Sequence, residues 1–127
     1  MTGSQRRGSV WALAVAGIVI ALASAALAEK HETPAIEMIS TNVQGKNVFI
    51  PGTIVMTAGK PQKITIFNTT DTPHGFTLAA AGIQTVLPPK QEHVVEVPAL
   101  RQGIYWIDCQ LHPPHRNAQL LVVESSD

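Results

Sequence analysis

The chain has 127 residues, with nine basic and nine acidic side chains, so its formal net charge at neutral pH is zero. Nucleic-acid recognition needs a basic patch, and no run of like charge stands out in the sequence, so we expect no nucleic-acid partner. A chain of this length holds one domain with a single hydrophobic core.

The N-terminal segment has the pattern of an export signal. Arg6 and Arg7 precede a long apolar stretch that ends in Ala26-Leu27-Ala28, the small-residue pattern read by signal peptidase. We therefore predict a signal peptide at residues 1–28 and one domain at residues 29–127, in an exported, periplasmic protein. Residues 10–28 carry no charge and are just long enough to span a bilayer. The alternative is an uncleaved anchor that holds the domain on the periplasmic side of a membrane.

The rest of the chain consists of short apolar and β-branched runs separated by Gly, Pro, Asn and Asp. Short strands at regular spacing, with turn residues between them, are typical of an antiparallel β-sandwich. We see no sustained helical periodicity after residue 30, although Ala79-Ala80-Ala81 could begin a short helical turn. The predicted fold class is all-β, with strands at residues 36–40, 48–50, 53–56, 63–67, 75–79, 84–87, 93–97, 104–109 and 119–124.

Alternation along the run that ends at Cys109 predicts which way the cysteine points. Successive side chains of a strand face opposite sides of its sheet. Tyr105, Ile107 and Cys109 therefore share one face, and Trp106 lies on the other. If the first set faces the core, Cys109 ends its strand pointing inward. His93 lacks neighbouring metal-competent residues, and we expect it to face solvent.

The segment Cys109-Gln110-Leu111-His112-Pro113-Pro114-His115 holds the only cysteine and two of the five histidines. In an exported protein a single cysteine is an intermolecular link, a buried thiol or a metal ligand. The two prolines stiffen the loop, and His74 offers a third imidazole upstream. A thiolate with imidazoles suits copper or zinc. The candidate metal ligands are His74, Cys109, His112 and His115, and such a set also fits tetrahedral zinc.

Several segments resemble the cupredoxin family of small copper proteins. They are Asn68 with Pro73-His74-Gly75-Phe76, the run from Gly103 to Cys109, and Cys109-x2-His112-x2-His115 followed by Leu120-Leu121-Val122-Val123-Glu124. In loop length the last motif is similar to the amicyanins, which have a methionine at its final position. In amino-acid sequence it is similar to nitrosocyanin, which has a glutamate at the position of His74.

The resemblance implies a Greek-key, cupredoxin-like β-sandwich with one mononuclear copper site. His74, Cys109 and His112 would be its strong ligands and His115 the fourth. It implies a one-electron carrier rather than an enzyme, whose redox partner protein docks on an apolar patch of Leu111, Pro113 and Pro114 around His112. The alternatives are a catalytic copper centre for a small molecule such as nitric oxide or superoxide, and a protein for copper delivery or storage. Membrane contact is expected only with an uncleaved signal, and no oligomeric state follows from the sequence.

Overall fold

The computed structural model describes residues 1, 3 and 32–126. The chain divides into two units, Met1–Lys30 and His31–Asp127, and the fold below is that of the second unit. The predicted signal peptide and its cleavage site lie outside the described residues and stay predictions. Within the described part of the chain, no helix is long and apolar enough to cross a membrane.

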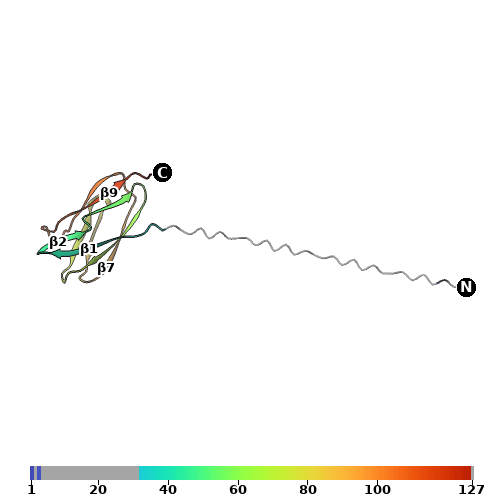
Figure 1. Cartoon of the computed structure of the whole chain (residues 1–127), viewed down its shortest axis with the longest axis horizontal. Coiled ribbons are helices and arrows are strands. Elements are labelled where there is room, and N and C mark those ends of the chain that lie inside the picture. The colour runs from blue at the N-terminus through green and yellow to red at the C-terminus, as the bar shows by residue number, and fades with distance from the viewer. Residues whose placement is uncertain (2, 4–31, 127) are drawn as a thin grey trace. The chain divides into compact units, whose positions relative to one another are not determined.

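The second unit is built from nine short strands and one turn of 3-10 helix (Figure 1). Each predicted strand overlaps an observed one, and the short turn falls where the three alanines are. Gly82 ends that turn with φ of 67°, in the left-handed region that glycine adopts without strain. The elements are β1 Ile36–Val43, β2 Lys46–Ile50, β3 Thr53–Thr57, β4 Gln62–Asn68, β5 His74–Leu78, η1 Ala79–Ala81, β6 Ile83–Leu87, β7 Glu92–Val97, β8 Gly103–Ile107 and β9 Ala118–Val123.

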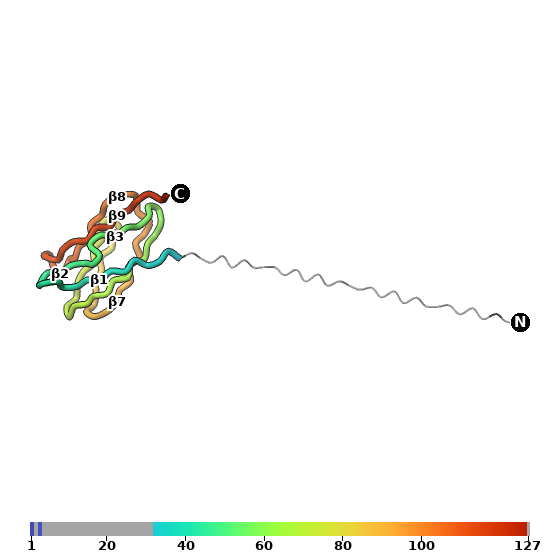
Figure 2. The backbone as a smooth tube through the Cα atoms, viewed as in Figure 1, coloured from blue at the N-terminus to red at the C-terminus, as the bar shows by residue number. Residues whose placement is uncertain are grey.

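The strands form two layers, and strands that are neighbours in a sheet are often not consecutive in the chain (Figure 2). One sheet has the order β2-β1-β4-β7, in which β1 and β4 run parallel. The other begins β3-β9-β8, with β3 and β9 parallel. The β5-β6 hairpin joins it through Thr77 and Asp108, whose amides and carbonyls exchange hydrogen bonds of 2.8 and 2.9 Å. The all-β Greek-key sandwich is confirmed, but its two parallel strand pairs depart from the purely antiparallel pairing that the sequence predicts.

Alternating side chains from both sheets fill the core. Ile64 and Ile66 of β4 and Leu120 of β9 are fully buried. On the strand that leads to the cysteine, Ile107 and Cys109 are buried, whereas Trp106 is 55% exposed. The predicted inward orientation of Cys109 is therefore confirmed, and the thiol lies at one end of the core.

The orientation predicted for His93 is wrong. This side chain is half-buried on β7, and its Nε2 lies 3.1 Å from the Thr85 hydroxyl on β6. The contact links the edge of one sheet to the hairpin of the other, and the alternation along β7 alone does not identify this partner. His93 has a structural role in this fold.

Candidate metal centre

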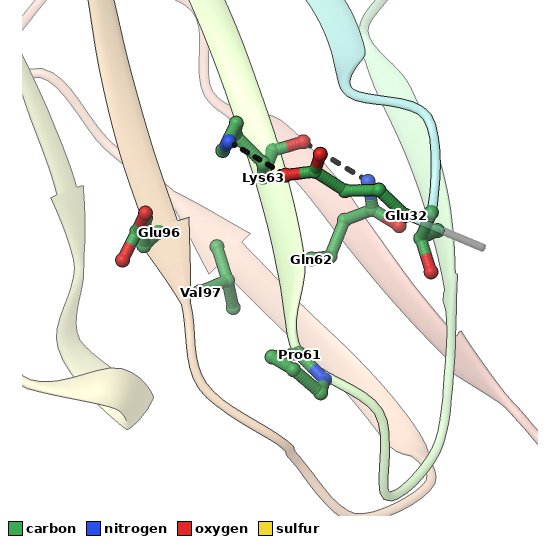
Figure 3. Close-up of a pocket in the computed structure, with 7 residues that line it drawn as sticks. Glu32, Pro61, Gln62, Lys63, Glu96 and Val97 are labelled. Carbon is green, nitrogen blue, oxygen red and sulfur yellow. Dashed lines mark hydrogen bonds and ion pairs between the residues drawn. The ribbon is translucent and has the colours of Figure 1, made fainter. Parts of the chain in front are cut away.

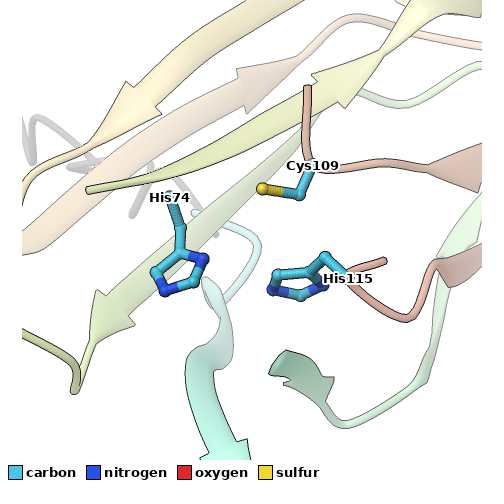
Figure 4. A group of neighbouring side chains, drawn as sticks. All are labelled: His74, Cys109 and His115. Carbon is cyan, nitrogen blue, oxygen red and sulfur yellow. The ribbon is translucent and has the colours of Figure 1, made fainter. Parts of the chain in front are cut away.

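His74, Cys109 and His115 meet at the end of the sandwich (Figure 4). His74 is the first residue of β5, Cys109 follows β8, and His115 lies in the loop before β9. Their potential ligand atoms all lie within 4.8 Å of one another, and the residues are 1%, 5% and 4% exposed. Among residues 32–126 this is the one group of three or more His, Cys, Asp or Glu side chains that could hold a metal ion.

Asn68 fixes the loop that delivers His74. This residue ends β4 and is fully buried. Its amide nitrogen donates to the carbonyls of Thr72 and Leu87, at 2.8 and 3.0 Å. Its carbonyl oxygen accepts from the Thr70 amide at 3.0 Å. A buried amide with all these partners holds residues 69–73 in one conformation, so β5 starts with its histidine pointing inward.

His74 is the clearest sign that the group fits a metal. Neither of its ring nitrogens has a hydrogen-bond partner, although both are buried. An unsatisfied buried polar group costs about 1–3 kcal/mol, and a bound metal ion would satisfy one nitrogen. Burial lowers the pKa of His74, and the nearby His112 and His115 rings lower it further. The neutral imidazole that results is the form that binds metals.

His115 is held in one tautomer. Its Nδ1 lies 3.0 Å from the Arg116 carbonyl, which can only accept, so Nδ1 carries the proton. Its Nε2 therefore carries the lone pair, which accepts from the Ser40 hydroxyl at 3.3 Å. The ring packs on Phe49 with centroids 4.3 Å apart. Burial lowers the pKa of His115, against the opposing effect of the Arg116 hydrogen bond. A backbone acceptor on the far nitrogen is the usual support of a metal-binding histidine.

The sulfur of Cys109 has its own hydrogen-bond donor and a clamp beside it. The Gly75 amide donates to Sγ at 3.1 Å. Gln110 crosses above this glycine, where its Oε1 accepts from the Thr77 hydroxyl and its Nε2 donates to the Thr85 carbonyl, each at 2.8 Å. These contacts tie the cysteine loop to the β5-β6 hairpin and fix the distance between Cys109 and His74.

His112 lies on the rim and is not a member of the group. The side chain is half-buried, and its Nε2 donates to the Pro73 carbonyl at 3.0 Å. Its ring centroid is 4.7 Å from that of His74, so it covers the buried imidazole from the solvent side. The structure thus brings three of the four predicted ligands together and places the fourth beside them. The full ligand set, with His112 in it, stays a prediction.

Sequence reasoning named Asn68 but did not identify Ser40, Phe49 and Gln110 as supports of this group. Ser40 and Phe49 come from β1 and β2, far from the ligand motifs in the chain. Gln110 lies within the motif and was read only as a spacer. The sequence did contain an indication of the Gln110 contact. Gly75 directly follows a predicted ligand, and a glycine at such a position indicates that another segment approaches the backbone closely.

Comparisons with known proteins agree with this architecture. The purple cupredoxin from Nitrosopumilus maritimus is 18% identical, with a TM-score of 0.53, over 69% of this chain and 99% of that one. Amicyanin from Paracoccus versutus is 15% identical, with a TM-score of 0.53, over 72% and 84%. The metal-binding domain of the Cu(I)-exporting P-type ATPase CopA of Streptococcus pneumoniae D39 is 17% identical, with a TM-score of 0.54, over 72% and 100%. At these identities the likeness shows the fold alone.

The family follows from the sequence match. No curated protein sequence matches the chain. The sequence pattern of the cupredoxin-like domain, however, matches residues 12–122, which is most of its length. The buried thiol and imidazoles have the soft, mixed donors that copper binds well. The chain therefore belongs to the cupredoxin-like family, and His74, Cys109 and His115 form its candidate for one mononuclear copper site.

Proposed function

We propose that this protein is an exported copper protein of the periplasm that carries one electron at a time. The observation that carries the proposal is the buried group of Cys109, His74 and His115, in which both His74 ring nitrogens lack partners. When bound, copper would supply a centre that alternates between Cu(I) and Cu(II). The neutral imidazoles and the soft sulfur of this group are suitable donors for both states.

The chain's own contacts suit an electron carrier because they keep the donors in place. Asn68 fixes the loop before His74, Gln110 ties the cysteine loop to the hairpin, and the Arg116 carbonyl fixes the tautomer of His115. A change of oxidation state is fast when the surroundings move little. Burial of all three donors keeps bulk water away from the metal.

The proposed exit for the electron is the rim at His112. This side chain lies between the buried His74 and the surface. Its neighbour Leu111 is 42% exposed, and Pro113 and Pro114 are also exposed. These residues form the apolar patch on which a redox partner protein would dock. Exposed apolar surface next to a redox centre allows short-lived docking without strong charge steering.

The second candidate function is a catalytic copper centre for a small molecule such as nitric oxide or superoxide. The composition of the buried group favours it, because three donors without His112 leave a fourth coordination position for a substrate. A catalytic metal site keeps such a position open, whereas a carrier closes it. The same donors could also serve copper delivery or bind zinc. The rate of metal exchange would test copper delivery, and competition between copper and zinc would test zinc binding.

Optical and electron-paramagnetic-resonance spectra of the copper-loaded protein test the proposal. We expect intense thiolate-to-copper absorption, lost in Cys109→Ser and strongly altered in His74→Gln. His93→Gln is the matched control, since this half-buried histidine lies outside the group. Absorption that survives in Cys109→Ser would contradict the ligand assignment. Azide that changes the spectrum at stoichiometric amounts would favour the catalytic centre over the carrier. Sequencing the N-terminus of periplasmic protein would test cleavage after Ala28.

A further inference from the structure

A pocket with basic walls lies beside the metal centre. It has a volume of about 430 Å³ and is lined by Gly45, Lys46, Asn47, His112, Pro114 and Arg116. The β1-β2 turn forms one wall and the cysteine-histidine loop forms the other. Two lining side chains carry a permanent positive charge, and none is acidic. A pocket more than ten times the roughly 30 Å³ share of one water admits a small anion with part of its hydration shell.

The two cations of this pocket are not neutralised by the protein. The ion pairs between described residues are Lys63 with Glu32 at 3.3 Å and Lys90 with Asp71 at 3.6 Å. Lys46 and Arg116 make no ion pair with any residue in 32–126, yet they line the same pocket. Two like charges that line one pocket repel each other, and an anion between them would replace that repulsion with attraction.

A second pocket of the domain has a different charge pattern (Figure 3). It has one lysine, Lys63, which pairs with Glu32, and Glu96 also lines it. Its cation is already compensated, and its carboxylates would repel an anion. The pocket beside the metal centre thus differs from this second pocket in having cations that no carboxylate in the described part of the chain pairs with.

The walls of the basic pocket are fixed before any ligand arrives. In the β1-β2 turn the Gly45 amide donates to Asn42 Oδ1 at 2.9 Å, and Asn42 Nδ2 donates to Asn47 Oδ1 at 3.0 Å. Between the walls, the Arg116 amide donates to the Asn47 carbonyl at 2.9 Å. The backbone that presents the cations thus needs no ordering on binding, which removes one of the main costs of association.

We propose that this pocket is a binding site for a small, doubly charged oxyanion of the sulfate or phosphate type. Two unpaired cations match two negative charges, and the side-chain NH2 of Asn47 adds a hydrogen-bond donor at the same pocket. The pocket shares His112 with the rim of the metal centre, where that ring is 4.7 Å from His74. The bound anion would thus lie one imidazole away from the metal ligands.

An amide-resolved NMR titration of the metal-free protein tests the site, and without metal no anion can bind at copper. Sodium sulfate is compared with sodium chloride of equal ionic strength. We expect saturable shifts at Lys46, Asn47 and Arg116. Lys46→Gln and Arg116→Gln should each weaken binding about thirtyfold, because a unit charge about 4 Å from a doubly charged anion in water contributes roughly that factor. Lys60→Gln and Arg101→Gln are matched controls with exposed cations elsewhere.

Each outcome decides the proposal. Saturation lost in the two pocket variants and kept in the two controls supports it. Shifts that rise without saturation, or that change equally in all four variants, would overturn it, since they report only general screening. Sodium acetate is the third arm. Acetate bound as tightly as sulfate would overturn the doubly charged class and reassign the pocket to carboxylates, such as those on an acidic protein surface.

Discussion

Gly75 leaves room for a side chain that crosses it, and this packing can be tested by substitution. A Cβ at this position would overlap Oε1 and Cδ of Gln110 and would lie 2.9 Å from the Gln110 backbone nitrogen. The first two atoms belong to a flexible side chain that can move, whereas the backbone nitrogen cannot. Gly75→Ala therefore lowers the free energy of unfolding in two ways. One part comes from overlap with the Gln110 side chain and disappears without it, and the other comes from the backbone nitrogen and remains.

The structure sets the size of both costs. Gln110→Ala removes two hydrogen bonds of 2.8 Å, which at about 0.5–1.5 kcal/mol each lowers the free energy of unfolding by about 1–3 kcal/mol. Gly75→Ala overpacks the same place and costs about 1–3 kcal/mol. In the double variant the side-chain overlap is absent. The losses in free energy of unfolding of the two single variants should therefore sum to more than the loss of the double variant. The difference, which is the coupling energy, should be about 1 kcal/mol.

Urea unfolding of the metal-free single and double variants measures this coupling. Gly103→Ala is the matched control, because a Cβ there meets the Tyr105 ring at 3.4 Å, an ordinary contact. We expect it to change the free energy of unfolding by less than about 0.5 kcal/mol. Strictly additive losses, or a Gly75→Ala variant as stable as Gly103→Ala, would refute the clamp.

Three further predictions concern the group itself. His115→Met should shift the copper spectrum toward blue and raise the reduction potential, because imidazole is a stronger donor than a long axial thioether; an unchanged spectrum and potential would exclude His115 as a ligand. Ser40→Ala should lower the free energy of unfolding of the metal-free protein by about 1 kcal/mol and tighten metal binding, since the hydroxyl competes for Nε2 of His115; weaker binding, measured by chelator competition, would contradict this. Burial lowers the pKa of both His74 and His115 below the ordinary 6.5, so the unfolded chain takes up protons first as the pH falls. The stability of the metal-free protein should be full above about pH 6.5 and be lost as the pH falls through the two folded pKa values, and His74→Gln should flatten that pH profile in denaturant titrations.

The strands could be predicted from the sequence because their determinants are local. Ile64 and Ile66 alternate with half-buried residues on β4, and glycines and prolines separate the runs. The same alternation placed Cys109 inward. The parallel pairs β1 with β4 and β3 with β9 are not local. They depend on which distant strands bury each other's faces, so the resemblance to a family, rather than the pattern, supplied the topology.

The residue types of the metal centre could be predicted, but their supports could not. Thiol and imidazoles within seven residues indicate a metal site on chemical grounds alone. The ring that Phe49 packs against and the nitrogen that Ser40 reaches depend on contacts between distant strands. Such contacts leave no recognisable spacing in the sequence. His93 was misplaced for a related reason, because its contact with Thr85 of the preceding strand depends on how the two sheets pack.

The two histidines of the loop show where spacing alone stops being informative. Cys-x2-His-x2-His makes His112 and His115 equally available, and the resemblance ranked His112 first. In the structure each ring has one nitrogen committed to a carbonyl, His112 through Nε2 to Pro73 and His115 through Nδ1 to Arg116. The remaining lone pairs are therefore on Nδ1 of His112 and on Nε2 of His115, the second of which accepts from the Ser40 hydroxyl. His115 is buried within the group while His112 covers it from the rim. The inner histidine is thus placed to hold the metal, and the outer one links it to the solvent-facing patch and the basic pocket.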